Sequence, residues 1–169
     1  MYKYYKLLDD VNYEIIIKAK GRNQYRYIYG INEWKETGML LLYHTEGNVK
    51  YEKYEIISES EAYEIIEKKK NIYKILKEKS IEIFCRHKKD ELPVLPFDDI
   101  ETTIVYLLSE TVCNTSEVEK LREKGFTERI IKSLCILVEN TDYKDEKQLK
   151  KLKSDYNAEK ILKYKNDAM

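Results

Sequence analysis

The sequence predicts an α+β protein in which a small, tyrosine-rich antiparallel β module, residues 1–60, precedes an all-helical domain, residues 61–169. Eleven of the 16 tyrosines lie at or before Tyr63, and aromatic residues favour the pleated, half-buried surface of a sheet. Four of the five glycines lie in the same part, at spacings typical of turns. Beyond it, apolar residues recur at helical spacing.

The first module is expected to contain four strands, near residues 2–8, 12–19, 24–29 and 38–43. The segments NYEIIIKAK and QYRYIYG are rich in β-branched and aromatic residues, as is typical of strands. Asp9-Asp10, Lys20–Asn23 and Gly30–Asn32 supply residues that favour turns. This spacing predicts an antiparallel meander or a small barrel.

A capping pair opens the helical part. The hydroxyl of Ser58 can accept from an early backbone N–H while Glu61 reaches back, and apolar residues then recur at helical spacing to about Lys79. A further helical stretch is expected over residues 80–87, before two prolines that favour an extended segment.

Five more helices are expected, over residues 104–112, 116–124, 127–140, 144–153 and 157–165. Ser116 and Thr127 are suitable N-caps, because their hydroxyls can accept from the first free backbone N–H groups. Gly125 suits the left-handed residue that often ends a helix. The last two segments are rich in lysine and amphipathic, so we expect their polar faces to be solvated.

Charge and hydropathy restrict the class of protein. Charged residues make up 37% of the chain and hydrophobic residues 43%, which fits a soluble, folded protein. The charges are interleaved and sum to zero, so no global field attracts nucleic acid or an anionic membrane. No apolar run approaches the length of a membrane span, and MYKYYKLLDD lacks the apolar region of a signal peptide. We therefore expect a cytoplasmic protein, and the heavy use of Lys, Ile, Tyr, Glu and Asn indicates an AT-rich bacterial or phage genome.

The cysteines argue against a disulfide framework and against a zinc site. Their number is odd and no CxxC pair occurs, at positions Cys85, Cys113 and Cys135. Each falls in an apolar or helix-like context, so we expect buried free thiols in a reducing compartment. A nucleophilic role for Cys113 would need a neighbouring base, and none is evident in the sequence.

One stretch resembles a known family. The run from Leu107 to Thr115, LLSETVCNT, resembles the signature Leu-Leu-His-Asp-x-x-Glu-Asp-Thr of HD domains, in the form typical of RelA/SpoT-type (p)ppGpp hydrolases. Residues 121–131 are similar to that family's helix, Gly-Phe turn and following helix. LPVLP resembles its Pro-Tyr-x-x-His-Pro stretch, and Ala158–Lys163 resembles the approach to its final Ala-Asp metal motif. The resemblance covers about 68–169 and implies an HD-like helical domain.

In such domains a divalent metal, usually manganese, is held by a His before Pro, a His-Asp pair and a late Asp. The resemblance matches these metal ligands, and the Glu-Asp pair that serves hydrolysis, to Leu95, Ser109, Glu110, Lys165, Cys113 and Asn114. Of these six only Glu110 is a carboxylate, and one carboxylate does not make a manganese site. A shifted alignment would add Asp167 as the late Asp. The chain has only two histidines, His44 and His87, and only His87 lies in the helical part. The resemblance therefore implies no metal, no catalytic residue and a reduced pocket at these positions.

Three functions remain open. The first is a catalytically inactive HD-like pseudo-enzyme that binds a nucleotide or a protein partner. The second is a small bacterial or phage interaction protein, such as an immunity or accessory protein, with no ligand pocket. The third is an active manganese-dependent nucleotide phosphohydrolase with displaced ligands, drawn from Glu110, Asp98, Asp99 and Asp167.

A second candidate surface lies in the β module. Its aromatic residues form a pattern that can stack nucleic-acid bases, at Tyr25, Tyr27, Tyr29 and Trp34. Alternate tyrosines on a strand also simply cover one face of a sheet, and both interpretations remain open.

Overall fold

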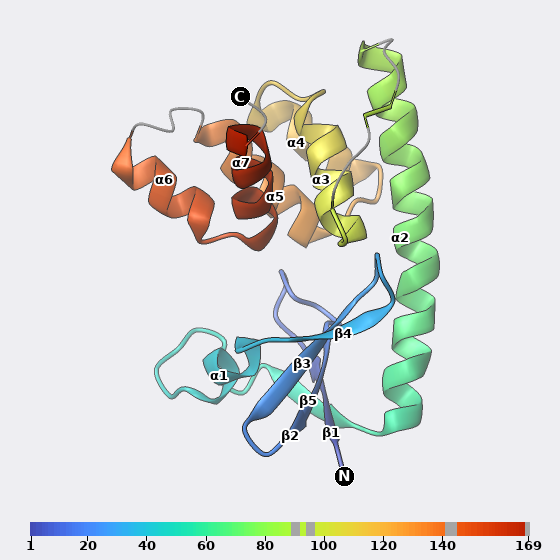
Figure 1. Ribbon diagram of the computed structural model, residues 1–169, viewed down its shortest axis with the longest axis vertical. Helices are drawn as coiled ribbons and strands as arrows, with labels where there is room; N and C mark the ends of the chain where they lie inside the picture. The colour runs from blue at the N-terminus through green and yellow to red at the C-terminus, as the bar shows by residue number, and fades with distance from the viewer. Residues whose placement is uncertain (89–91, 94–96, 141–144, 168–169) are drawn as a thin grey trace. The chain divides into compact units, whose positions relative to one another are not determined.

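The computed structural model describes residues 1–88, 92–93, 97–140 and 145–167 (Figure 1). A five-stranded sheet at the N-terminus is followed by helices, so the predicted α+β class is confirmed. The chain forms two compact units, Met1–Tyr73 and Lys74–Met169, and the division falls inside the long helix α2, Glu59–Lys88. The sequence placed this division at about residue 60, where α2 begins.

The sheet is antiparallel, with strand order β4-β3-β2-β1-β5. Its strands are β1 Lys3–Leu7, β2 Ile16–Lys20, β3 Asn23–Ile28, β4 Glu33–Glu36 and β5 Tyr54–Ile57. Tyr5 of β1 lies opposite Ile17 and Ile56, and Ile17 also lies opposite Arg26. Residues in register share a face, so odd and even positions of β1 point to opposite sides of the sheet.

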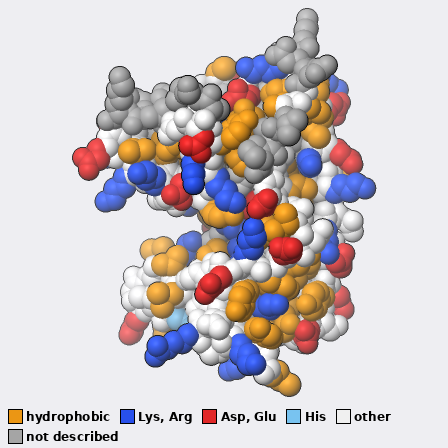
Figure 2. All heavy atoms as spheres, viewed as in Figure 1, with side chains coloured by type: hydrophobic (Ala, Val, Ile, Leu, Met, Phe, Trp, Pro, Cys, Tyr) orange, Lys and Arg blue, Asp and Glu red, His pale blue; other side chains and the backbone are white. Residues whose placement is uncertain are grey.

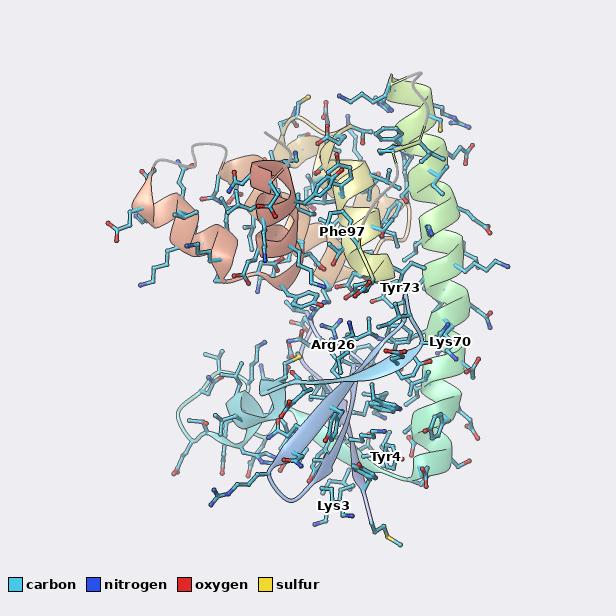
Figure 3. The ribbon with its side chains drawn as sticks, in the orientation of Figure 1. Lys3, Tyr4, Arg26, Lys70, Tyr73 and Phe97 are labelled. Carbon is cyan, nitrogen blue, oxygen red and sulfur yellow. The ribbon has the colours of Figure 1, made fainter. Side chains whose placement is uncertain are left out.

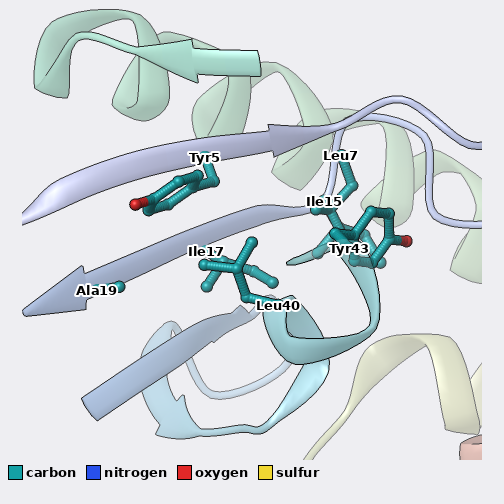
Figure 4. Packing of buried hydrophobic residues seen from close by; sticks show 7 residues of the cluster. All are labelled: Tyr5, Leu7, Ile15, Ile17, Ala19, Leu40 and Tyr43. Carbon is teal, nitrogen blue, oxygen red and sulfur yellow. The ribbon is translucent and has the colours of Figure 1, made fainter. Parts of the chain in front are cut away.

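One face of the sheet packs against the short helix α1, Met39–His44 (Figure 4). The buried cluster on this side comprises Tyr5, Leu7, Ile15, Ile17, Ala19, Leu40 and Tyr43. The carboxylate of Asp9 accepts hydrogen bonds from Tyr43 Oη of α1 and from the backbone and side-chain nitrogens of Asn12. Lys50 Nζ lies 4.0 Å from the same carboxylate. This cluster fixes the turn between β1 and β2 to α1.

The other face packs against the first half of α2. Tyr4 Oη donates to Glu59 at 2.5 Å, and the ring of Tyr29 lies 5.0 Å from that of Tyr73. Lys70 lies 5.4 Å from the ring of Tyr27, and Figure 3 shows Tyr4, Lys70 and Tyr73 in the region between sheet and helix. Tyrosines on alternate strand positions thus cover a sheet face, as the sequence pattern allowed.

Two strand predictions need correction. Residues 38–43 were expected as a strand but form α1, because Met39 and the leucines after it are good helix formers without a branch at Cβ. The edge strands β4 and β5 were not predicted. Both are four residues long, and three of the four residues of β4 are charged, so neither carries the apolar alternation of an inner strand.

The helix α2 begins as predicted, since the backbone N–H of Glu61 donates to Ser58 Oγ at 3.1 Å. It runs unbroken to Lys88 and includes the stretch expected as a separate helix. The remaining helices of the second unit are α3 Ile100–Ser109, α4 Thr115–Glu123, α5 Glu128–Glu139, α6 Glu146–Lys153 and α7 Tyr156–Asp167.

The caps of α4 and α5 agree with the sequence at two of three positions. Thr127 caps α5, and Gly125 follows α4 with a φ of 85°. The N-cap of α4 is Asn114 and not Ser116. Its amide oxygen accepts from the N–H of Glu117 at 3.0 Å, while the carboxylate of Glu117 accepts from the N–H of Cys113 at 2.7 Å. This reciprocal pair satisfies two free donors and so begins the helix earlier.

The helix α5 lies at the centre of the second unit. It packs against α3, α4, α6 and α7, and α3 also packs against α7. Ile130, Ile131 and Leu134 are at most 1% exposed. The close packing of these apolar residues of α5 against its neighbours brings α3 beside α7.

Candidate functional site

The segment that resembles the HD signature forms the last residues of α3, the turn after it and the start of α4. Leu107 and Leu108 are buried in the core of the unit, with at most 1% exposure. At the other end of α3, the carboxylate of Asp99 accepts from the N–H of Glu101 at 3.0 Å and caps the helix. The buried leucines fix the rotation of α3, so Ser109 and Glu110 lie half-buried at its C-terminal end.

Glu110 pairs with two lysines from distant segments. Lys165 Nζ of α7 donates to Glu110 Oε1 at 2.7 Å, and Lys88 Nζ at the end of α2 lies 3.9 Å from Oε2. The side chains of Glu110 and Lys165 are 26% and 35% exposed, so water reaches the pair. A carboxylate at the C-terminal end of a helix is disfavoured by the helix dipole, and the two ammonium groups offset that cost.

The residues present at this position do not fit a manganese ion. An ammonium group occupies the space beside the carboxylate, and it offers no lone pair. Ser109 Oγ donates to the carbonyl of Tyr106 at 2.8 Å and is directed at its own helix. Within the described ranges, no three His, Cys, Asp or Glu side chains come together as a metal site. Leu95 lies outside the described residues.

Cys113 and Asn114, which match the hydrolytic pair of the family, are exposed and belong to the cap of α4. Cys85 is also exposed and Cys135 is half-buried, which corrects the expectation of three buried thiols. Cys85 and Cys135 follow the buried residues Phe84 and Leu134 and so lie beside the buried faces of α2 and α5, while Cys113 precedes the N-cap of α4. His87, exposed at the end of α2, has Nδ1 2.9 Å from the carbonyl of Ile83.

A shallow cavity of about 230 Å³ lies beside α7. It is lined by Phe97, Asp98, Lys160, Lys163, Tyr164 and Asp167. The ring of Phe97 lies 5.3 Å from that of Tyr164 and 5.7 Å from that of Tyr106, and Figure 3 shows Phe97 in the segment before α3. Burial raises the pKa of Tyr106, and the charge of Glu110 raises it further.

The four carboxylates of the displaced-ligand hypothesis do not share one site. Asp98 and Asp167 line the cavity beside Lys160 and Lys163. Asp99 caps α3 inside the core, and Glu110 is paired with Lys165.

A buried polar network joins α3, α5 and α7. Glu101, 1% exposed, forms an ion pair with Arg129 and accepts from the side-chain amide of Asn157 at 2.9 Å. The oxygen of that amide accepts from Thr102 at 2.8 Å, and its nitrogen lies 3.1 Å from Ser133 Oγ. The sequence did not single out these residues. Their only signal is that Glu101, Thr102 and Ser133 interrupt helix faces that are otherwise apolar.

The predicted stacking residues lie in the sheet unit. Tyr27 and Tyr29 are buried, at 5% and 8% exposure, and their rings contact each other at 5.3 Å. Tyr25 and Trp34 are half-buried. The ring of Trp34 lies 5.3 Å from that of Tyr27, with the planes at 80°. Of the four residues, Tyr25 and Trp34 thus keep partly accessible rings.

Comparison of the chain with protein-family models, with curated proteins and with solved structures found no match. Among the described helices, none is long and apolar enough to span a bilayer.

Proposed function

We propose that the helical unit is a non-catalytic HD-like module that binds a nucleotide in the cavity beside α7. The ion pair between Glu110 and Lys165 is the observation that carries the HD-like, non-catalytic part of this proposal, and the lining of the cavity supports the ligand. These positions match two metal ligands of the family, one in the His-Asp pair of the signature and one near the C-terminus.

The distance between the two side chains supports the resemblance. Ligands of one metal ion must lie within a few ångströms of each other, although the two positions are 55 residues apart in sequence. Nζ of Lys165 and Oε1 of Glu110 are 2.7 Å apart. Two positions matched by letters alone therefore meet in space, as ligands of one metal do.

The chemical nature of the pair supports the absence of catalysis. Hydrolysis needs a water molecule activated by a metal or by a positioned base. The lysine supplies a positive charge of its own where the family holds a cation, and it leaves Glu110 engaged as an ion-pair partner. The ancestral position then keeps its structure without its metal.

The lining of the cavity supports a nucleotide as ligand. Lys160 and Lys163 can contact phosphate oxygens, and the rings of Phe97 and Tyr164 offer apolar surface to a base. Asp98 and Asp167 can accept from amino groups of a base. A volume of about 230 Å³ holds only part of a nucleotide, so the remainder extends into solvent.

Isothermal titration calorimetry with ppGpp, GDP and ATP tests the proposal. We expect saturable binding of at least one nucleotide, weakened about tenfold or more by Lys163→Ala, because a charge-assisted contact contributes roughly 1.5–3 kcal/mol. Lys150→Ala, an exposed lysine of α6, is the matched control and leaves the affinity unchanged. A folded protein that binds none of the three nucleotides contradicts the proposal.

A second candidate function, binding of a protein partner, is supported by exposed apolar side chains of the sheet unit. The sheet unit exposes several apolar side chains that suit a protein partner, with Leu41 at 64%, Val49 at 83% and Ile56 at 59% exposure. Under this alternative the protein is a bacterial or phage interaction module. Unchanged thermal stability with every nucleotide, together with a stable complex that Leu41→Ser disrupts, would favour it.

A further inference from the structure

Three aromatic rings surround the ammonium group of Lys18 in β2. They come from β3, from β4 and from the residue before β1. Nζ of Lys18 lies 4.4 Å from the ring centroid of Trp34, 5.0 Å from that of Tyr2 and 5.8 Å from that of Tyr25. Lys18 lies opposite Tyr4 of β1 and Tyr25 of β3, so all of these side chains leave the same face of the sheet. We call Tyr2, Tyr25 and Trp34 the aromatic cage.

The cage is held by further rings. Trp34 meets Tyr27 at 5.3 Å and Tyr4 at 6.3 Å, in both cases edge to face. Tyr2 meets Tyr25 at 6.3 Å with the planes at 78°. Figure 2 shows hydrophobic side chains gathered on this side of the sheet unit, with Lys or Arg side chains among them. The rings are therefore positioned in advance, and a ligand would not have to order them.

Two carboxylates lie near the aromatic cage. Tyr25 is paired in register with Glu36, which is exposed beside the cage, and Glu59 accepts from Tyr4 at 2.5 Å. Burial lowers the pKa of Lys18 below its usual value, and the charge of Glu59 offsets only part of that change. The ammonium thus gives up part of its hydration to stay among the rings.

We propose that the aromatic cage binds a quaternary ammonium group, and that Lys18 is an internal occupant which this ligand displaces. A primary ammonium is strongly hydrated and loses much by entering an apolar site. A quaternary ammonium is larger and more weakly hydrated, and its methyl groups contact ring faces directly. The chain's own lysine already shows that the three rings accept a positive charge. The cage lies in the first unit and is independent of the nucleotide proposal.

The fluorescence of Trp34 reports binding at the aromatic cage directly, because Trp34 is the only tryptophan of the chain. The probe is tetramethylammonium chloride, with sodium chloride at the same concentration as the control for ionic strength. We expect a saturable change in the wild type and a dissociation constant at least tenfold lower in Lys18→Thr, which empties the cage and suits a strand. Lys20→Thr, at the exposed end of the same strand, should match the wild type.

Two further variants make the test specific. In the Lys18→Thr background, Tyr25→Leu and, separately, Tyr2→Leu should each weaken binding about tenfold, and Tyr2 is exposed enough that its removal spares the fold. Choline, a trimethyllysine peptide and the unmethylated peptide then identify the source of the ligand. The proposal is overturned if Lys18→Thr shows no saturable change in fluorescence, or if neither tyrosine replacement weakens binding.

Discussion

The ammonium group of Lys165 lies 2.7 Å from a carboxylate oxygen of Glu110, across 55 residues of sequence. This contact joins the C-terminal end of α3 to α7. It also places an ammonium group beside the carboxylate whose position resembles a metal ligand.

The strength of that pair can be measured by a double-mutant cycle with Glu110→Gln and Lys165→Met. Both side chains are partly exposed, so we expect a coupling energy of about 0.5–1 kcal/mol. Urea unfolding followed by circular dichroism gives the four free energies, and added salt should reduce the coupling. Lys163→Met, on the same helix, replaces Lys165→Met in a control cycle and should show no coupling to Glu110. A coupling energy of zero in low salt would mean that the pair contributes nothing.

Breaking the buried network around Glu101 should lower the stability of the protein more than breaking the pair of Glu110 and Lys165 does. Arg129→Met leaves the carboxylate of Glu101 buried without its cation, and we expect it to lower the free energy of unfolding by about 3–5 kcal/mol. The double variant Glu101→Leu with Arg129→Met removes both charges and should recover part of that loss. Urea unfolding measures both. If Arg129→Met costs less than about 1 kcal/mol, the network does not hold α3, α5 and α7 together.

Asp9 predicts a dependence of stability on acid pH. Burial alone would raise its pKa, but hydrogen bonds from Tyr43 and Asn12 and the charge of Lys50 outweigh burial and lower it. A carboxyl whose pKa is lowered in the folded state stabilises the fold above its unfolded pKa of about 4, and that stability is lost as pH falls through the folded pKa. Unfolding by urea between neutral pH and about pH 2.5, followed by Trp34 fluorescence, should show this loss in the wild type. Asp9→Asn should be less stable at neutral pH and should lose less on acidification; an equal loss in both proteins would refute the role of Asp9.

Gly125 and Gly38 allow the effect of backbone strain on stability to be measured separately from that of packing. A Cβ added at Gly125 or at Gly38 meets no atom within 4 Å, but Gly125 has a φ of 85° and Gly38 has a φ of −103°. Gly125→Ala should therefore lower the free energy of unfolding by about 1 kcal/mol, while Gly38→Ala should leave it unchanged or raise it slightly. Thermal melting of the two variants decides this, and equal shifts would show that the left-handed turn after α4 is not required.

Local patterns were sufficient to predict much of the fold. Strands β1 to β3 follow from segments rich in tyrosine and isoleucine, with alternating tyrosines in β3. Ser58, Gly125 and Thr127 each act on neighbours within a few residues. The helix α1 packs through Leu40 and Tyr43 on the sheet face that holds Tyr5 and Ile17, a contact between distant segments that the alternation of a strand does not encode.

The sites depend on partners that are far apart in sequence. Glu101 and Asn157 are 56 residues apart, and a lone polar residue on a helix resembles an ordinary surface residue until its partner is known. Lys18 likewise resembles any strand lysine, and only the register with Tyr25 places it among the rings. The resemblance to HD domains matched Glu110 and Lys165 to two metal-ligand positions, and only the structure shows that their side chains are in contact.

Electron paramagnetic resonance of manganese tests the central claim most directly, because free Mn²⁺ in water gives a strong signal that is lost on binding to a protein. Because Lys165 neutralises Glu110, we predict that adding the wild-type protein leaves the amplitude of the Mn²⁺ signal unchanged at micromolar metal. Loss of the signal at one ion per chain, abolished by Glu110→Ala, would show that this position still holds its metal and would contradict the account.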